Sequence, residues 1–439
     1  MKRWRHILFW LIAVIIAILA FFLFVLTPLD DQFSLGRSVT QIYYADNISD
    51  AHQKMVDVFN QEYAGEIEVI PVNLPFSKFT TNERKEILAR SLRSQSEHID
   101  VFAVDLIWSP RFAKWSVPLD DHIGKNVLDN IHEKALKSCY FNEKLVAMPL
   151  YLDFGNLYYR RDFIRELKNG EEIEQKILNS ITWEELLKLG EKFRNKDIPV
   201  YLFAGDKFEG LVCSFHEMLS DSESAEMFDG EQVNLNTPAA RRGLQLLVDL
   251  IYKYKLTPPI VTEFDEYNSY IYSNIHDALF LRGWTGFHKH YFNVVPDTSK
   301  LKNFLLAPLP HFKGNTTSSV YGGWNLMISK NSTKQDACLK FLKFAFRKDI
   351  QQILYALGGY IPVNKEVYND HEYMDKHQGL AYILKLFEWG RHRPYKESYT
   401  KISDIMSIYL HKALKNEMGV EEALITASQA INSQRAFIK

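Results

Sequence analysis

The stretch IDVFAVD, residues 99–105, is the part of the sequence from which the fold class follows. It is apolar enough to be buried on both faces of a sheet, which is typical of a parallel strand. Upstream, VTQIYYAD (39–46) and EIEVIPV (66–72) also have strand patterns, and helical patterns follow each of them, the second over 82–94. This alternation of strands and helices predicts an α/β fold.

The rest of the chain continues the alternation. Strands are predicted over 198–205, 277–283, 303–310 and 325–330, with helical segments between them. Thr182 and Glu185 form the pattern of a capping box, and Pro238 after Thr237 stands at a first helical position. There is no internal repeat and no low-complexity linker, so we expect short connections between any two lobes.

Length and composition limit the class of protein. A chain of 439 residues predicts two domains, conceivably three. With 46% hydrophobic and 24% charged residues, it can bury a large core and is not mainly disordered. The 52 Lys and Arg against 54 Asp and Glu give a net charge of −2, and nothing in that balance indicates nucleic-acid binding.

One long apolar segment lies near the N-terminus. From Ile7 to Leu26 the chain carries no charge, and such a helix is long enough to span a bilayer. Lys2, Arg3 and Arg5 precede it, so the positive-inside rule predicts a cytoplasmic N-terminus and an exported body. A cleavable signal peptide is the alternative, but its apolar region is usually shorter. We therefore expect residues 1–29 to be a cytoplasmic tip and an uncleaved anchor.

No catalytic or metal-binding motif stands out. The sequence lacks GxSxG, Walker A, GxGxxG and CxxC patterns, and neither His132-Glu133 nor His288-Lys289-His290 completes a metal site. We predict no cofactor and no metal. A glycosidase pair built from distant carboxylates stays open, because it leaves no local pattern. Cys139, Cys213 and Cys338 permit at most one disulfide and are expected to be small core residues.

Aromatic residues next to glycine or a carboxylate recur at the strand boundaries. Trp108 follows Asp105, the stretch YLDFGN begins at Tyr151, and Trp284 and Trp324 follow RG and GG. Ligands of open α/β sheets bind at strand carboxyl ends and domain interfaces. Aromatic faces suit the apolar patches of a sugar ring, and carboxylates or guanidinium groups suit its hydroxyls. Taken singly, each of these residues is better explained as core or as a turn cap.

The order of several longer stretches resembles the sugar-binding family of extracellular solute-binding proteins of ABC transporters, which includes maltose- and trehalose-binding proteins. The stretches include IDVFAVDLIWSPRFAKW, AMPLYLDFGNLYYRRDF, DALFLRGWTGF, VYGGWNLMISKNS and RPYKESYTKISDIM. The resemblance implies a two-lobe, periplasmic-binding-protein-like fold of type II. The one N-terminal transmembrane helix expected before it follows from the apolar segment instead, because the family usually has a lipidated cysteine or a cleavable signal there. The resemblance places lobe 1 at 38–150 plus 305–354 and lobe 2 at 151–304 plus 355–439.

The same resemblance implies ligand-binding residues. These are Asp105, Trp108, Tyr151, Asp153, Trp284, Gly322, Gly323, Trp324 and Arg393, with Arg84 and the loop from Asp46 to Asp50 as weaker candidates and Arg391 as a substitute for Arg393. The bare backbone of Gly322 and Gly323 would approach the sugar while the Trp324 indole stacks on it. The sequence departs from the family pattern in two local places: a Gly common in the family is missing after Phe112-Ala113, and residues 166–176 form an inserted stretch.

These features together predict a function. We expect a membrane-anchored protein that captures a mono- to oligosaccharide in an interlobe cleft and delivers it to an ABC permease, without catalysis. The body would lie in the periplasm or outside the cell. A ligand-sensing domain for a membrane signalling partner is the first alternative, and a glycoside hydrolase is the second.

Overall fold

The strands of the described residues are joined in one main sheet. The computed structural model describes residues 14–16, 39–94, 99–196, 198–228, 232–290 and 295–433. The strand order is β2-β1-β3-β10-β6-β8-β7, with β11 paired to β10 and β9 paired to β6. The bounds are β1 (Thr40–Asp46), β2 (Ile67–Asn73), β3 (Val101–Asp105), β6 (Met148–Arg160), β7 (Tyr201–Leu202), β8 (Phe280–Trp284), β9 (Phe304–Ala307), β10 (Ser319–Ile328) and β11 (Gly390–Arg391), while β4 (Tyr140–Phe141) and β5 (Lys144–Leu145) form a separate hairpin.

The predicted α/β class is confirmed, and the strands differ from expectation at particular places. β1, β2 and β3 form where predicted and pair in parallel. The strand predicted over 198–205 is only Tyr201–Leu202, and β10 begins at Ser319 rather than 325. β10 extends through its glycines because Tyr321 to Trp324 pair with β6, which compensates for the weak strand preference of glycine.

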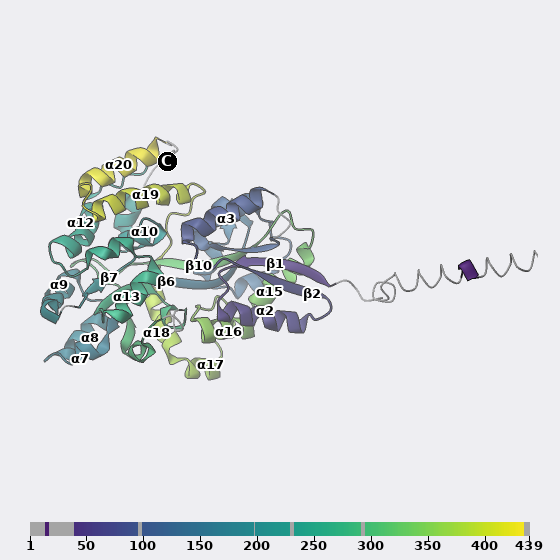
Figure 1. The fold of residues 1–439 in the computed structure, drawn as a ribbon, viewed down its shortest axis with the longest axis horizontal. Helices are drawn as coiled ribbons and strands as arrows, with labels where there is room; N and C mark the ends of the chain where they lie inside the picture. The colour runs from purple at the N-terminus through teal and green to yellow at the C-terminus, as the bar shows by residue number, and fades with distance from the viewer. Residues whose placement is uncertain are drawn as a thin grey trace, which may run out of the picture.

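Two long strands, β6 and β10, run through the middle of the molecule. β6 pairs with β10 along its first half, from Met148 to Phe154. Along its second half, from Gly155 to Arg160, it pairs with β8 and β9. Each half of β6 therefore belongs to a different group of packed elements, which lie on either side of it in Figure 1.

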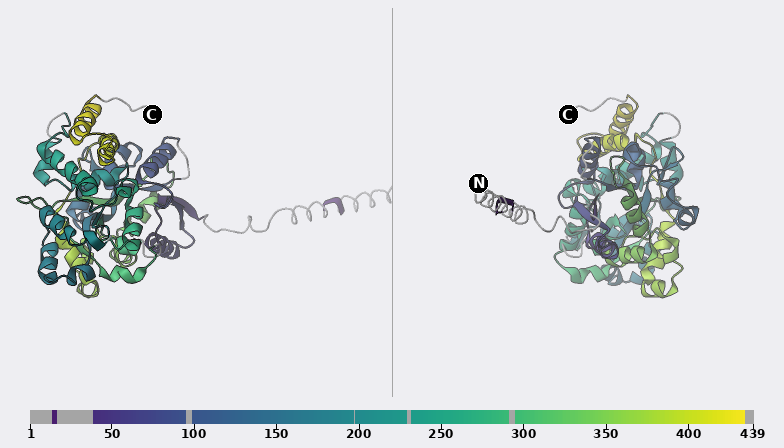
Figure 2. Two further views of the ribbon diagram at one scale, coloured as in Figure 1. Left: turned by 60° about the vertical axis from the view of Figure 1, so that its left-hand side comes forward. Right: turned by 90° about the vertical axis from the view of Figure 1, so that its right-hand side faces the viewer.

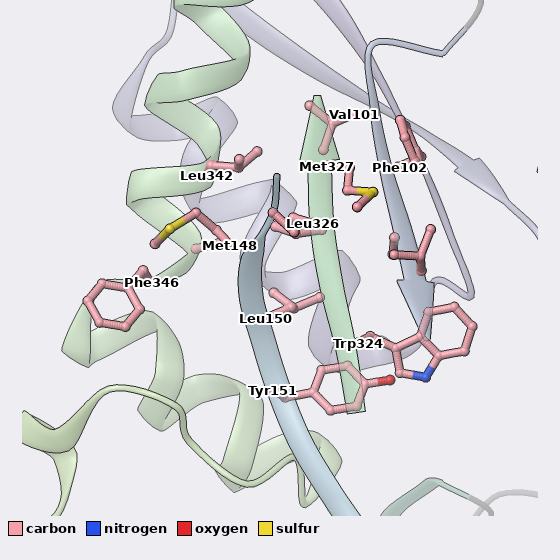
Figure 3. Packing of buried hydrophobic residues seen from close by; sticks show 14 of the residues in the cluster. Val101, Phe102, Met148, Leu150, Tyr151, Trp324, Leu326, Met327, Leu342 and Phe346 are labelled. Carbon is pink, nitrogen blue, oxygen red and sulfur yellow. The ribbon is translucent and has the colours of Figure 1, made fainter. Parts of the chain in front are cut away.

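Those groups have separate hydrophobic cores. The first core contains residues such as Phe59, Phe102, Leu326 and Phe341, and the second contains residues such as Trp183, Leu244 and Met406. Figure 3 shows the first core from close by, where Val101, Leu150 and Leu326 of neighbouring strands lie near Leu342 of α15. A third, smaller cluster contains Tyr158, Leu281 and Phe287, which belong to β6, β8 and α14. We call the elements around the first core the first lobe, and those around the second core and this smaller cluster the second lobe.

The helices divide between the lobes. In the first lobe are α2 (Asp50–Glu62), α3 (Thr81–Arg93), α4 (Ser109–Phe112), α5 (Lys125–Asp129), α6 (Glu133–Lys137), α15 (Gln335–Ala345), α16 (Lys348–Gly358), α17 (His371–Lys376) and α18 (Gln378–Phe387). In the second are α7 (Arg161–Arg165), α8 (Gly170–Leu178), α9 (Trp183–Glu191), α10 (Glu209–His216), α11 (Asp221–Glu226), α12 (Pro238–Tyr252), α13 (Glu266–Ile275), α14 (Phe287–His290), α19 (Tyr399–Leu414) and α20 (Val420–Asn432). Figure 2 shows the same arrangement from two further sides.

Local signals explain several helix starts. The capping box predicted at Thr182 and Glu185 begins α9, and Pro238 stands in the first turn of α12 after the Thr237 cap. Ser49 and Thr80 also form capping boxes, which begin α2 and α3.

The predicted lobe boundaries at 150/151, 304/305 and 354/355 remain a prediction. Leu380, Ile383 and Leu386 of α18, placed in lobe 2 by the resemblance, are buried in the first core.

The predicted membrane anchor, residues 7–26, lies outside the described part except for residues 14–16. Within the described ranges, no helix combines the length and the apolar character that crossing a bilayer requires.

Candidate functional site

A cavity with a volume of about 280 Å³ lies between the two lobes. Its walls come from the end of β3, the middle of β6 and β10, the end of β8 and the starts of several helices. Most of the residues singled out in the sequence line it: Asp105, Tyr151, Asp153, Trp284, Gly322, Gly323, Trp324 and Arg393. Trp108 and Arg84 do not.

Arg393 links the two lobes at one wall of this cavity. Its guanidinium donates to Glu209 Oε1 at 2.6 Å, to Asp105 Oδ1 at 3.0 Å and to the carbonyl of Tyr321 at 3.2 Å. Asp105 is the last residue of β3 in the first lobe, whereas Glu209 begins α10 of the second. Arg393 is buried, and the two carboxylates offset the free-energy cost of removing its charge from water. A buried charge is stable only when it is paired and hydrogen-bonded. The predicted Arg393 therefore orients Asp105, and both face the cavity.

Two further carboxylates line the cavity and accept hydrogen bonds from N–H groups instead of pairing with a cation. Asp153 Oδ1 accepts from the backbone N–H of Phe154 and of Thr285, both at 2.8 Å, and Glu266 Oε1 accepts from Trp284 Nε1 at 3.3 Å. Burial raises the pKa of Asp153 to about 6 and that of Glu266 to about 7. Near neutral pH both groups titrate, so each can accept or donate a hydrogen bond to a polar ligand.

The two glycines of β10 have structural reasons of their own. A Cβ on Gly322 would lie 2.8 Å from Trp284 Cζ3, so the indole packs directly against the bare strand. Gly323 has φ of +126°, and a Cβ there would lie 2.5 Å from the carbonyl oxygen of Tyr151. The resemblance predicts that these two glycines let a sugar approach the backbone closely. The packing of Trp284 and of β6 already requires glycine at both positions.

Trp324 belongs to the first core as well as to the cavity wall. Only 7% of it is exposed, and its ring packs edge-on against Trp108 with centroids 5.5 Å apart. Figure 3 shows Trp324 beside Tyr151 at the end of the packed strands. Trp108 is 2% exposed, and it also stacks on Phe112. Trp108 is not among the residues that line the cavity: it packs against Trp324 and supports that ring.

Arg84 also lies behind the cavity wall. Its guanidinium carbon is 4.3 Å from the ring centroids of both Phe76 and Trp324, and Nη2 donates to Asp46 Oδ1 at 3.0 Å. No part of the residue is exposed. Phe76 and Trp324 line the cavity, so Arg84 positions two lining rings rather than lining the cavity itself.

Of the remaining weaker candidates, some line the cavity and others do not. Arg391 donates to the carbonyl oxygens of His216, Leu219 and Ser220, and so caps the end of α10 away from the cavity. In the loop from Asp46 to Asp50, Asn47 and Ser49 line the cavity. Asp46 is buried as the acceptor for Arg84 and for the Tyr44 hydroxyl at 2.6 Å.

Sequence reasoning missed most of the lining that helix starts provide. Thr80 caps α3, Asp265 caps α13 and Glu209 begins α10, and all three line the cavity. Ser49, the cap of α2, also lines it and belongs to the predicted loop 46–50. The caps were readable as helix signals, but nothing in the sequence said that these helices begin at one place. Helix N-termini present backbone N–H groups and a partial positive charge, which suit hydroxyl and other oxygen ligands. Phe76, Phe208, Tyr267, Phe287 and Tyr360 add further aromatic lining.

Metal ligation has no support in the described part of the chain. No group of at least three His, Cys, Asp or Glu side chains is gathered there in a way that could hold an ion. His288 contacts the Tyr270 hydroxyl and the carbonyl of Phe304, which is a structural role. All three cysteines are buried free thiols, so no disulfide forms among them.

A cavity between two α/β lobes that are joined by continuous strands defines a protein that binds a small ligand between its lobes. The chain belongs to the family of bacterial extracellular solute-binding proteins, whose sequence profile matches residues 45–352. The resemblance drawn from the sequence is therefore confirmed at the level of the family. That family and the relatives below consist of binding proteins, and the chain is accordingly not an enzyme.

Individual relatives agree with this assignment. The chain is 22% identical to a probable ABC transporter-binding protein of Deinococcus radiodurans over 92% of this chain and 95% of the relative. It is 24% identical to a putative binding protein of Brucella abortus over 79% of this chain and 80% of the relative.

Solved structures show the same fold. Maltose-bound MalE3 of T. maritima superposes with a TM-score of 0.77 at 27% identity, covering 90% of this chain and 100% of that chain. The GacH receptor of Streptomyces glaucescens, solved unliganded and with acarbose, gives a TM-score of 0.76 at 17% identity, covering 92% of this chain and 100% of that chain. The two-lobe fold predicted from the sequence is confirmed by these likenesses.

Proposed function

We propose that the protein binds a mono- to oligosaccharide in the cavity between its lobes and delivers it to an ABC permease. The observation that carries the proposal is the lining itself. Aromatic rings from both lobes, Trp284 on β8 and Tyr151 on β6, share the cavity with Asp105 and Arg393. Sugar rings need both kinds of group, because their C–H faces are apolar and their hydroxyls are polar.

Each lining group has a defined part in this proposal. Trp284 is half-buried, and its indole is held by Gly322 on one side and by the Arg282 guanidinium, 4.2 Å from the ring centroid, on another. A ring fixed in this way loses little entropy when a sugar stacks on it. Asp105, already oriented by Arg393, would accept from sugar hydroxyls, and Asp153 and Glu266 would do so from the other wall.

The transport role rests on the family and on the relatives. One relative is described as an ABC transporter-binding protein, and the similar MalE3 structure holds maltose. We propose that this chain likewise hands its sugar to membrane-embedded permease subunits, with its body outside the cytoplasmic membrane and residues 7–26 as a single-pass anchor. A protein held at the membrane would meet its permease without diffusing through the surrounding space.

A carbohydrate panel tests the binding proposal. We expect at least one mono-, di- or oligosaccharide, in a set that includes maltose and trehalose, to raise the thermal unfolding temperature. A ligand at about 100 times its dissociation constant adds about 2.7 kcal/mol to the free energy of unfolding. If no sugar in the panel stabilises the protein, the proposal fails.

Trp284→Ala tests whether this indole contacts the sugar in the cavity between the lobes. The variant should bind the sugar at least tenfold more weakly by titration calorimetry, because a stacked aromatic face is lost. Trp324→Ala is a different case: this ring is buried against Trp108, so its removal should also cost about 3 kcal/mol of folding stability. Unchanged affinity in Trp284→Ala would remove this indole from the site.

The anchor needs a separate experiment. In cells that express the full chain with a C-terminal epitope, the protein should sediment with membranes and resist extraction by high salt. The epitope should be cleaved by protease added to intact spheroplasts. Release of a shortened protein into the soluble fraction would instead show cleavage near residue 29.

A further inference from the structure

Side chains that do not line the cavity join the two lobes at one of its ends. Thr80 and Thr81 line the cavity where α3 begins. One turn further along α3, Lys85 Nζ donates to both carboxylate oxygens of Asp404 on α19, at 2.8 and 3.0 Å. Asn82 Nδ2 donates to the same carboxylate at 3.1 Å. Neither Lys85 nor Asp404 is part of the cavity lining.

These partners belong to different lobes. α3 packs into the first core through Leu88 and Leu92, whereas α19 packs into the second through Ile405 and Met406. Only 2% of Lys85 is exposed in this arrangement. An ammonium group this buried needs its carboxylate partner, and the Asp404 side chain on the other lobe is 42% exposed. Moving the lobes apart would break the pair and expose the Lys85 ammonium to water. The contact can therefore exist only while the lobes are close together.

A second lysine, Lys289, also joins the two lobes close to a residue that lines the cavity. Phe287 lines the cavity, and two residues later Lys289 Nζ donates to the carbonyl oxygens of Tyr355 and Ala356, each at 2.8 Å. These carbonyls belong to the last turn of α16 in the first lobe, where a cation is favoured by the helix dipole. The backbones also meet here, because a Cβ on Gly359 would lie 3.1 Å from the Cα of Gly286.

We propose that the Lys85–Asp404 pair and the Lys289 contact with α16 are two interlobe latches that set the population of the closed arrangement. A ligand held between the lobes binds more tightly when the closed arrangement is more populated, so the latches would tune affinity without touching the ligand. This consequence for affinity rests on the proposed binding function, whereas the latches themselves are a property of the protein without sugar.

Distance measurements on the ligand-free protein test the latches. Spin labels are placed on exposed positions of the two lobes, by Lys54→Cys on α2 and Asn268→Cys on α13, in a Cys213→Ser background. The parent should show a short interlobe distance as a resolved population. Lys85→Met and Lys289→Met should each lower that population at least threefold. High salt should lower it in the parent, because the Asp404 carboxylate of the Lys85 pair is 42% exposed and salt screens its attraction to the ammonium.

The controls separate a latch from a general effect of losing a lysine. Lys340→Met removes an exposed pair with Glu66, 3.6 Å apart and within the first lobe, and should leave the distances unchanged. Lys85→Asp combined with Asp404→Lys should restore the short distance. Unchanged distributions in both Met variants, or a parent with no short-distance population, would overturn the inference. Failure of the sugar panel would refute the proposed function and leave this result standing.

Discussion

Arg84 is held between two rings by a single buried carboxylate. Its guanidinium lies over Phe76 and Trp324, and Asp46 is its hydrogen-bond partner in a place where neither group reaches water. Removing one member of such a pair leaves the other charge buried without compensation. The arrangement makes the position of two cavity rings depend on one ion pair.

We expect Arg84→Met to lower the free energy of unfolding by about 3 kcal/mol, because Asp46 loses its cation. Adding Asp46→Asn to that variant should recover part of the loss, since the amide carries no charge. Denaturant unfolding of the single and double variants measures both effects. Equal stability of Arg84→Met and the parent would show that the pair contributes nothing.

Asp153 should make stability depend on pH. Its pKa is raised by burial to about 6 in the folded protein, so the folded state binds more protons than the unfolded state between about pH 4 and 6. The free energy of unfolding should therefore fall as pH rises through this range. Asp153→Asn should reduce this slope, leaving the part that comes from Glu266, and gain about 1 kcal/mol at pH 7 to 8, a value reduced for partial exposure.

Denaturant titrations from pH 4 to 8 measure that difference. Glu226→Gln, which replaces an exposed carboxylate of α11, is the matched control and should keep the slope of the parent. A slope in Asp153→Asn equal to that of the parent would mean that this carboxyl titrates normally.

At the scale of elements, β10 meets β6 at its most constrained point. The register of the two strands shifts between Trp324 and Asn325, directly after the positive φ of Gly323. This irregularity turns the Trp324 ring toward the cavity, and β-bulges commonly redirect a side chain in this way. β10, which carries Trp324 of the cavity wall, therefore leaves no room for a side chain at Gly323.

Gly323→Ala should lower the free energy of unfolding by about 2 kcal/mol or more, because its methyl group would meet the carbonyl of Tyr151. Gly314→Ala is the matched control. Gly314 also has a positive φ, of +89°, but a Cβ there meets nothing within 4 Å. Gly314→Ala should lower the free energy of unfolding by only about 1 kcal/mol, because alanine is disfavoured at positive φ but meets no neighbouring atom there. Equal losses in both variants would contradict the steric explanation.

At the scale of the whole molecule, the three cysteines report on different motions. Cys139 and Cys338 are buried in the first core, whereas Cys213 on α10 lines the interlobe cavity. Burial raises the pKa of all three thiols, that of Cys338 to about 12, so none is reactive while it is enclosed. Only separation of the lobes should bring Cys213 to solvent without unfolding a core.

A disulfide reagent should therefore modify one thiol of the native protein slowly and all three after unfolding. Cys213→Ser should abolish the slow native reaction, and a bound sugar should slow it in the parent. Two or three thiols reacting at one rate under native conditions would mean that the lobes do not open independently of unfolding.

The sequence by itself determined the α/β class, several strands and helix caps, and eight of the residues that line the cavity. Asp105 and Trp284 were predictable because they stand where a strand ends, and strand ends of such sheets meet at ligand sites. The N-cap signals of Thr80 and Thr182 were equally local, since a cap depends on residues within one turn.

Only the tertiary structure decided which of those residues reach the cavity. Trp108 and Trp324 have the same local character, yet one supports the other from behind. Arg393 pairs with Glu209, and Lys85 pairs with Asp404. Both partners are distant in sequence, so local sequence patterns could not predict them. Burial and pairing depend on how whole elements pack, and packing is a property of the folded molecule rather than of any stretch of it.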